Sequence, residues 1–392
     1  MKARNRSEQE ERIRVMRTPR KIDIDLTARC NLRCTYCYFF DNPEVEYQDL
    51  PTDDWLRFFG ECGRLGVMEL TLAGGEPFMR KDLRALIEGV VANRMRFSML
   101  SNGALINEDN AGFIAGTGRC NSIQISIDGS CPEVHDTCRG KGSFESAVRG
   151  IQTLQRLSIP VAVRMTIHQH NVNDLANTAR FLLEDLGLPS FSTNSAGYLG
   201  TCRVNAQDVM LTVEERQFAM EELLSLSEKF NGRISASAGP LAEARAWRDM
   251  EKARNEAAPA KPDRGYLTGC GCPTSKIAVR ADGVIVPCNM LTHIELGRIN
   301  QDSLQEVWQS SPALNDLRFR RYIPLTNFEF CSGCPYISYC TGNCPALSFT
   351  LTGKVDHPSP DACLRRFLRD GGKIPEKFTL HSENQINIEV IQ

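Results

Sequence analysis

The sequence predicts an α/β protein: a partial, open (β/α)6 barrel followed by a small, cysteine-rich domain. Three observations support this prediction. Strand-like and helix-like segments alternate through the first half of the chain, 16 cysteines are present, and eight of them lie between residues 269 and 363. Such alternation is typical of a parallel sheet with helices outside, and six units suit an open barrel better than a closed one of eight.

The strand candidates are short, apolar or β-branched segments bounded by turn residues. They cover residues 21–27, 67–73, 96–101, 121–128, 160–167 and 189–196. Amphipathic segments of helical length lie between them, at 52–66, 82–94 and 175–187. A further helix is predicted over 212–230, with Thr212 as its N-cap and Glu215 three residues later.

Composition divides the chain and limits its environment. We expect an N-terminal extension (1–20), the barrel (21–210), a bridging helical region (211–267), the cysteine-rich domain (268–370) and a C-terminal tail (371–392). A net charge of −2 predicts no binding to nucleic acid or to an anionic membrane. The first twenty residues lack the apolar core of a signal peptide, and no apolar run is long enough for a membrane span. We therefore expect a cytoplasmic protein whose cysteines bind metal or act in catalysis instead of forming disulfides.

The first cysteine cluster follows directly on the first strand. In the segment TARCNLRCTYCYF (27–39), Cys30, Cys34 and Cys37 are spaced C-x3-C-x2-C. The loop would lie at the C-terminal end of the parallel strands, where α/β proteins form their sites. Three thiolates suit a four-iron cluster that keeps one iron open. A zinc site or free thiols are the alternatives, although zinc would need a fourth ligand and the loop contains no histidine.

Further motifs follow the next strands in order. The residue before Cys37 is aromatic, the second strand ends in AGGEP (73–77), and SNG (101–103), SIDG (126–129) and HDTCRG (135–140) come after. In this order the motifs resemble those of the radical SAM superfamily, whose members cleave S-adenosylmethionine (SAM). Each motif alone is weak, but each falls at the C-terminal end of a successive strand.

The resemblance implies one [4Fe–4S] cluster on the three cysteines and a set of SAM contacts. Glu76 would bind the SAM ammonium group and Arg139 its carboxylate, while Gly74 and Gly75 let the backbone approach a ligand closely. The full set of implied contacts is Tyr36, Gly74, Gly75, Glu76, Ser101, Asn102, Ser126, Asp128 and Arg139. The implied reaction is reductive cleavage of SAM to a 5′-deoxyadenosyl radical, with a flavodoxin or ferredoxin as reductant.

A second cysteine cluster lies near the C-terminus. The segment CSGCPYISYCTGNC (331–344) has the spacing C-x2-C-x5-C-x3-C, with Cys272 and Cys288 upstream and Cys363 downstream. This pattern resembles the SPASM extension of radical SAM enzymes, which holds two auxiliary iron–sulfur clusters. The resemblance implies one cluster on Cys270, Cys272, Cys288 and Cys344, and another on Cys331, Cys334, Cys340 and Cys363. Cys270 is either the fourth ligand of the first auxiliary cluster or a thiol that binds no iron, in which case one iron of that cluster stays open to substrate.

The resemblance favours a peptide substrate, because most well-known members with this extension modify peptides or protein side chains. We expect maturation of a ribosomally made precursor peptide. The runner-up is modification of a haem-type tetrapyrrole. Sulfatase maturation is less favoured because those enzymes place an aspartate base after the cysteine at position 288, where this chain has Asn289. An electron carrier and a zinc-binding protein are the non-enzymatic alternatives.

The position of the first strand suggests how a precursor peptide would reach the enzyme. Peptide-maturing relatives often carry an N-terminal module that binds the leader peptide, but the first strand here starts near residue 21. We therefore expect a separate recognition protein to deliver the peptide.

Overall fold

The computed structural model describes residues 15–40, 49–268 and 271–375. All six predicted strands form one sheet: β1 (Lys21–Thr27), β2 (Glu69–Gly74), β3 (Arg96–Ser101), β4 (Cys120–Ser126), β5 (Val161–Ile167) and β6 (Phe191–Ser195). Each pairs with the next in parallel. The predicted open barrel of β-α units is confirmed.

The sheet extends beyond the six predicted strands at both edges. Its order is β10-β9-β8-β1-β2-β3-β4-β5-β6-β7. The predicted bridging region contributes the short β7 (Ile234–Ala236), parallel to β6. From the cysteine-rich part come β8 (Lys276–Val279), β9 (Val284–Val286) and β10 (Gly297–Arg298), and β8 pairs with β1 in parallel. The two predicted domains therefore share one sheet.

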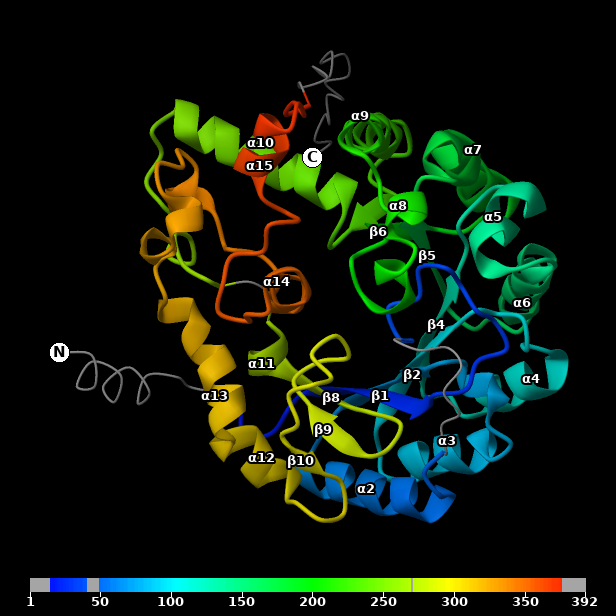
Figure 1. Ribbon diagram of the computed structural model, residues 1–392. Helices are drawn as coiled ribbons and strands as arrows, with labels where there is room; N and C mark the ends of the chain where they lie inside the picture. The colour runs from blue at the N-terminus through cyan, green and yellow to red at the C-terminus, as the bar shows by residue number, and fades with distance from the viewer. Residues whose placement is uncertain (1–14, 41–48, 269–270, 376–392) are drawn as a thin grey trace, which may run out of the picture.

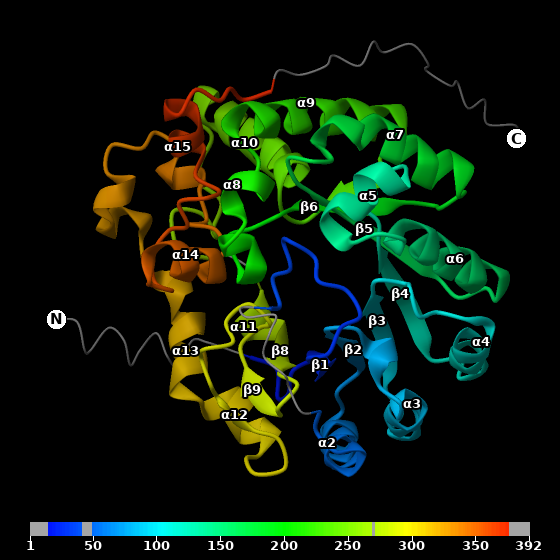
Figure 2. The ribbon, with the colours of Figure 1, turned by 45° about the vertical axis from the view of Figure 1, so that its right-hand side comes forward.

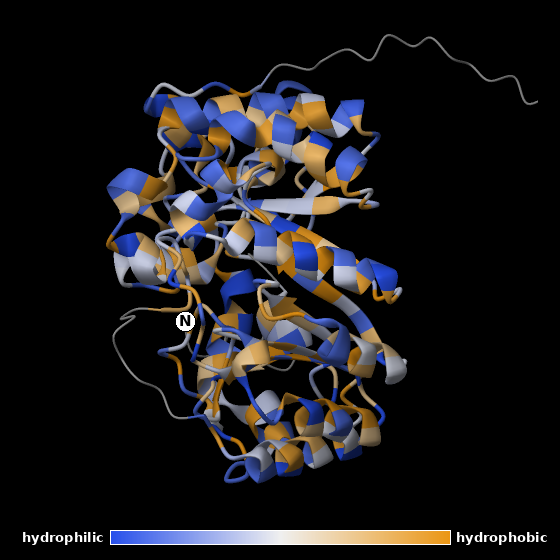
Figure 3. Ribbon diagram, turned by 90° about the vertical axis from the view of Figure 1, so that its right-hand side faces the viewer, coloured by the Kyte–Doolittle hydropathy of each residue, from blue (hydrophilic) through white to orange (hydrophobic). Residues whose placement is uncertain are grey.

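Helices cover the outer side of this sheet (Figure 1). They are α2 (Thr52–Leu65), α3 (Leu83–Ala92), α4 (Glu108–Gly116), α5 (Pro132–Arg139), α6 (Ser143–Arg156), α7 (Leu175–Arg180), α9 (Val213–Lys229) and α10 (Pro240–Asn255). The short α8 (Ala206–Val209) instead lies beside the cysteine loop, where Val209 packs in one cluster with Tyr36. The predicted helix over 175–187 ends in a π-helical turn, Phe181–Asp185. The predicted cap of α9 is present, because Thr212 and Glu215 form a capping box. Figure 3 shows these helices striped with hydrophilic and hydrophobic residues.

The cysteine-rich part consists of short elements joined by turns. Its helices are α11 (Cys272–Ser275), α12 (Leu304–Ser310), α13 (Pro312–Phe319), α14 (Pro345–Thr352) and α15 (Leu364–Arg369). Within the described residues, the 3-10 turns are Pro77–Met79, Val172–Asp174, Gly200–Arg203, Arg320–Tyr322, Leu325–Asn327, Glu329–Cys331 and Ile337–Tyr339. None of the described helices is both long and apolar enough to cross a membrane.

Strand alternation separates an apolar face of the sheet from a mostly polar one. On β1, Ile22, Ile24 and Leu26 are buried in the core under the helices. Because side chains alternate along a strand, Asp23 and Asp25 lie on the opposite side, which we call the inner face. By the same alternation and register the inner face of β1 to β6 includes Asp23, Asp25, Thr71, Ala73, Ser98, Leu100, Gln124, Ser126, Ala162, Arg164, Thr166, Ser192 and Asn194.

Candidate active site

The loop after β1 brings Cys30, Cys34 and Cys37 to the C-terminal end of the strands. Figure 2 shows this loop in the middle of the molecule, between the strands and helix α14. Thr201 donates its hydroxyl to the Cys34 carbonyl at 3.1 Å, and Asn205 donates its amide to the Thr35 carbonyl at 2.8 Å. The loop therefore has a defined backbone, fixed by the segment that follows β6.

Polar donors surround the three thiols. The Leu32 backbone N–H lies 3.5 Å from Cys30 Sγ, and the Asn102 side-chain amide lies 3.8 Å from the same atom. Arg139 Nη1 lies 4.0 Å from Cys34 Sγ. Such donors and this cation favour thiolate ligands, so the residues present fit an iron–sulfur cluster.

The same thiols hold their protons tightly without metal. Burial raises the pKa of Cys30 to about 11. Burial also raises the pKa of Cys34 to about 12, although the neighbouring Arg139 acts in the opposite direction. Cluster binding must therefore displace these protons.

The GGEP segment packs directly against the cysteine loop. Gly74 has φ of 120°, and a Cβ at this position would lie 2.2 Å from the Thr27 carbonyl oxygen. A Cβ at Gly75 would lie 2.2 Å from the Arg29 carbonyl oxygen. The Gly75 and Glu76 N–H groups donate to these two carbonyls, each at 2.8 Å. The close approach that the glycines permit is therefore with the start of the cysteine loop.

Glu76 is a fully buried carboxylate at the end of β2. It accepts hydrogen bonds from Ser101 Oγ at 2.9 Å, from the Asn102 N–H at 2.8 Å and from the Phe78 N–H at 3.2 Å. Burial raises the pKa of Glu76 to about 7, although these hydrogen bonds oppose the rise. A cation beside Glu76 would offset the burial, which fits the ammonium group of SAM.

Asp128 lies at the centre of a buried polar network instead of facing an open space. One of its carboxylate oxygens accepts from the Tyr36 hydroxyl and from Arg139 Nε, and the other accepts from the Thr166 N–H at 2.8 Å. Burial alone would raise the pKa of Asp128, but Arg139 outweighs it and the pKa is lowered. Asp128 thus holds Arg139 and Tyr36 in place. Ser126 is half-buried at the end of β4.

His135, His168 and Asn171 form a further layer of hydrogen bonds around the backbone of Asp128. The sequence alone did not indicate these roles. His135 Nδ1 accepts from the Asp128 N–H at 3.1 Å. The Asn171 amide donates to the carbonyls of Asp128 and Thr166, and its oxygen accepts from the His168 N–H at 2.8 Å. Burial lowers the pKa of both histidines to about 4, so they are neutral at physiological pH.

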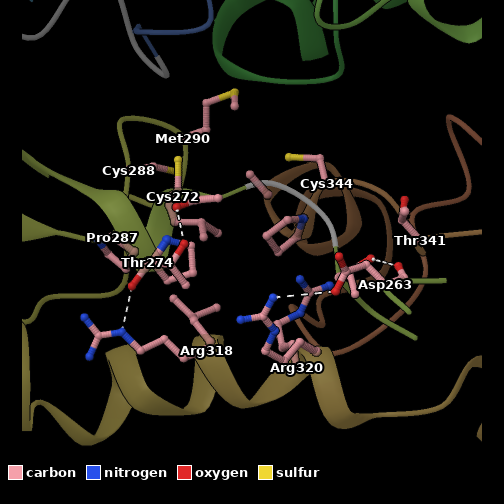
Figure 4. Close-up of a pocket in the computed structure, with 18 of the residues that line it drawn as sticks. Asp263, Cys272, Thr274, Pro287, Cys288, Met290, Arg318, Arg320, Thr341 and Cys344 are labelled. Carbon is pink, nitrogen blue, oxygen red and sulfur yellow. Dashed lines mark hydrogen bonds and ion pairs between the residues drawn. The ribbon is translucent and has the colours of Figure 1, made fainter. Parts of the chain in front are cut away.

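The cysteines implied for the first auxiliary cluster line one cavity of about 230 Å³. Figure 4 shows Cys272 at the start of α11, Cys288 after β9 and Cys344 before α14 around this cavity, with Met290 above and Arg320 below. Cys270 lies outside the described residues. Three sequence-distant segments therefore present thiols to one space.

The cysteines implied for the second auxiliary cluster meet in a different pocket. Its lining includes Cys331, Cys334, Cys340 and Cys363. The Gly342 N–H lies 3.4 Å from Cys340 Sγ. The pKa of Cys331 is raised to about 12, mainly by burial and in part by the neighbouring thiols of Cys340, Cys363 and Cys334. The predicted grouping of these four residues is thus present, and their ligation stays a prediction.

Two inner-face aspartates lie between the cysteine loop and the first cavity. Asp23 forms an ion pair with Lys276 of β8 at 2.6 Å. Asp25 accepts a hydrogen bond from the amide of Asn289 at 2.8 Å. Sequence reasoning gave Asp25 no role, although the signal was available: the strand KIDIDLT alternates buried apolar residues with aspartates.

Two family models match the sequence. The radical SAM superfamily model covers residues 24–182, and the model of SPASM, an iron–sulfur cluster-binding domain, covers residues 270–335. Fold, site and match together define an enzyme of the radical SAM superfamily, as the motifs predict. Within that superfamily the chain belongs to the members with a SPASM domain. Cys340, Cys344 and Cys363 lie beyond the second match, so their grouping depends on the structure.

Curated relatives span most of the chain. The PqqA peptide cyclase of Ruegeria pomeroyi is 25% identical over 340 residues, which are 84% of this chain and 83% of the relative. The AdoMet-dependent heme synthase of Methanosarcina barkeri is 26% identical over 352 residues, which are 89% of this chain and 97% of the relative. The chain is thus similar to both kinds of enzyme, at nearly the same identity.

Solved structures share the fold. SuiB of Streptococcus suis bound to its precursor peptide SuiA has a TM-score of 0.67 at 15% identity, covering 92% of this chain and 80% of that chain. The enzyme anSMEcpe with bound AdoMet has a TM-score of 0.65 at 16% identity, covering 89% of this chain and 96% of that chain. At such identities the likeness concerns the fold alone.

Proposed function

We propose that this radical SAM enzyme abstracts hydrogen from a ribosomally made precursor peptide and forms a crosslink or rearranges its backbone or side chains. Peptide cyclases are among its curated relatives, and SuiB, with the same fold, has been crystallised with a precursor peptide. Haem synthases are equally similar, so sequence similarity alone does not separate the two substrates.

The polarity of the inner face is the observation that favours a peptide over a tetrapyrrole as substrate. Serine, threonine, asparagine and glutamine side chains are frequent on this face, which also holds Asp23, Asp25 and Arg164. Haem-type tetrapyrroles are flat, largely apolar rings with carboxylate side chains. Asp25 would repel such carboxylates, and Lys276 is already paired with Asp23. A peptide instead offers N–H and carbonyl groups that match these side chains.

Two inner-face side chains support the choice of a peptide. Thr71 Oγ1 and Asn194 Oδ1 are buried and have no hydrogen-bond partner among the described residues. Buried polar atoms in native proteins are normally paired, so an unpaired atom calls for an explanation. Peptide groups of a bound substrate would provide the missing donors and acceptors.

Bound SAM and the iron–sulfur cluster on Cys30, Cys34 and Cys37 would supply the 5′-deoxyadenosyl radical that removes hydrogen. Glu76 would hold the ammonium group of SAM. Arg139 would hold the carboxylate of SAM. Its guanidinium is fixed by the ion pair with Asp128, and its Cζ lies 5.5 Å from the centre of the Tyr36 ring. We further propose two auxiliary iron–sulfur clusters, one in each of the cysteine-lined pockets, with Cys270 as the fourth ligand of the first.

We propose that the enzyme works in the reducing cytoplasm, where free thiols persist. We also propose a flavodoxin or ferredoxin as electron donor and a separate protein that delivers the precursor peptide. Affinity capture with candidate small proteins encoded nearby tests the delivery protein. Tight leader binding by the isolated enzyme would argue against it.

The function is tested with anaerobically reconstituted enzyme, SAM, dithionite and short precursor peptides encoded beside its gene. We expect 5′-deoxyadenosine together with a peptide whose mass has changed, with a loss of two hydrogens for a crosslink. Modification of an iron tetrapyrrole without change in any peptide would overturn the substrate assignment. Cys30→Ala is the negative control and is expected to abolish deoxyadenosine formation.

A further inference from the structure

Asp25 links the barrel to the cavity that Cys272, Cys288 and Cys344 line. It lies on the inner face of β1 opposite Ala73 of β2, and only 2% of its surface is exposed. Its Oδ1 accepts from the amide of Asn289, the residue directly after Cys288. A carboxylate from the first strand therefore lies one residue from a proposed ligand of the first auxiliary cluster.

The charges around Asp25 leave it without a counter-ion. Its neighbour on the same face, Asp23, is paired with Lys276 at 2.6 Å. Among the described residues no cation pairs with Asp25. The other titratable groups on this side are Tyr38 of the cysteine loop, which is 42% exposed and interacts electrostatically with Asp25, and Arg164 of β5, which interacts with Tyr38.

This environment gives the carboxyl group a proton affinity suited to neutral pH. Burial raises the pKa of Asp25 to about 7, the hydrogen bond from Asn289 opposes the rise, and Asp23 adds to it. A general base works best when its pKa lies near the working pH, because it then both accepts and releases protons readily. Asp23 is instead held in its ion pair with Lys276.

We propose that Asp25 is the general base that accepts the proton lost by the substrate as its product bond forms. Asn289 engages one carboxylate oxygen and leaves the other for the proton. Because Asn289 follows Cys288, the proton and the electron would leave the substrate at adjacent positions. The inference uses the radical chemistry of the superfamily, and for a peptide substrate it also rests on the proposed function.

The atoms and electrons of this step balance. A substrate C–H bond breaks and its hydrogen atom forms 5′-deoxyadenosine. The carbon radical forms a bond to a second substrate atom that carries hydrogen. The substrate then transfers one electron to an oxidised iron–sulfur cluster and one proton to the Asp25 carboxylate, which becomes a carboxylic acid. The product has lost two hydrogens in total.

The test compares Asp25→Asn with wild type, using the peptide that wild type modifies. Asparagine keeps the shape and the contact with Asn289 but cannot accept the proton. We expect 5′-deoxyadenosine formation within about twofold of wild type, while product per deoxyadenosine falls about 100-fold. Wild-type product formation should rise as the pH increases through about 7, and the variant should lack this rise.

Asp23→Asn is the matched control, and Asp25→Glu is the conservative variant. We expect Asp23→Asn to keep the wild-type ratio of product to deoxyadenosine at pH 8 and to shift the pH profile to lower pH, because Asp23 helps to raise the pKa of Asp25. We expect Asp25→Glu to recover part of the product. If Asp25→Asn formed as much product per deoxyadenosine as wild type, the proposal would be overturned. An equal loss of deoxyadenosine formation and product would also overturn it, because that pattern indicates a structural role.

A substrate-free measurement separates this inference from the proposed function. Infrared difference spectra of wild type against Asp25→Asn should contain a carboxyl band that titrates near pH 7. Absence of that band would overturn the inference for any substrate. If wild type modifies no peptide, the proposed function fails, and the same variants are then compared with an iron tetrapyrrole as probe.

Discussion

Asp25 and Asp128 are both buried carboxylates, and they differ in how their charge is balanced. Asp128 is paired with Arg139 and accepts hydrogen bonds from Tyr36 and Thr166. Asp25 has only a neutral amide as its hydrogen-bond donor among the described residues. Burial without a cation destabilises the folded state, so we attribute the presence of Asp25 to function and that of Asp128 to architecture.

Replacing Asp128 should be strongly destabilising. In Asp128→Ala the buried guanidinium of Arg139 loses its counter-ion, and we expect a loss of about 3–5 kcal/mol in the free energy of unfolding. Anaerobic urea denaturation of the reconstituted protein measures it. Asp109→Ala, which breaks the exposed pair with Arg84, should change the same quantity by less than about 0.5 kcal/mol. A similar effect of both variants would contradict the assignment.

Replacing Asp25 should have the opposite effect on stability. Its pKa is about 7 in the folded protein, well above the ordinary aspartate value of 3.8. The folded state therefore binds this proton more tightly, and stability falls as the pH rises from about 4 to 7. Asp25→Asn removes this loss. We expect about 4 kcal/mol of stabilisation at pH 8 and almost none below pH 4, measured by denaturation at both pH values. Equal stabilisation at both values would refute the explanation.

The sequence predicts some of these residues better than others. The cysteines and the motif residues follow strands in a recognisable order, so their meeting at one end of the sheet could be predicted. The pairing of Asp25 with Asn289 could not, because the two residues are 264 positions apart and no local pattern connects them. The hydrogen bonds from Tyr36, Arg139 and Thr166 to the Asp128 carboxylate could not be predicted for the same reason.

At the scale of elements, the cysteine loop and the GGEP segment form one unit. The Gly75 and Glu76 N–H groups bind the carbonyls of Thr27 and Arg29, and the two glycines leave no space for a side chain. The turn after β2 therefore determines where the loop after β1 lies. A motif that looks like a ligand contact in the sequence also has this structural role.

Gly75→Ala tests this coupling. The added methyl group would meet the backbone oxygen of Arg29, which cannot rotate away, so we expect about 1–3 kcal/mol of destabilisation. Iron content after reconstitution and deoxyadenosine formation should both fall. Gly112→Ala, within α4 and with no atom within 4 Å of the new methyl group, should keep both at wild-type values. Normal iron content in Gly75→Ala would contradict the coupling.

Element prediction succeeded where periodicity was long and failed where elements were short. The six barrel strands have five to seven residues and clear boundaries. By contrast, β7 and β9 have three residues and β10 has two, which is too few for a detectable alternation. Their place in the sheet is set by tertiary pairing instead of local sequence.

At the scale of the whole molecule, the sheet joins the two predicted domains. Strand β8 pairs with β1 over four residues, and Lys276 reaches Asp23 across the same contact. We therefore expect the barrel and the cysteine-rich domain to unfold together. Hydrogen exchange should give the amides of β1 and β8 the same free energy of opening. Much faster exchange in β8 than in β1 would indicate two independent units.

The pairing of β1 with β8 also constrains how the protein is made. Asp23 and Lys276 are 253 positions apart, so the outer edge of β1 stays unpaired while all of the chain between them is synthesised. At roughly 5–20 residues per second, that interval lasts roughly 13–50 seconds on the ribosome. During this time an open parallel edge and a nascent thiol-rich loop are accessible to other chains and to oxidants. Chaperone binding and a delay in cluster insertion until release are the natural requirements of such a topology.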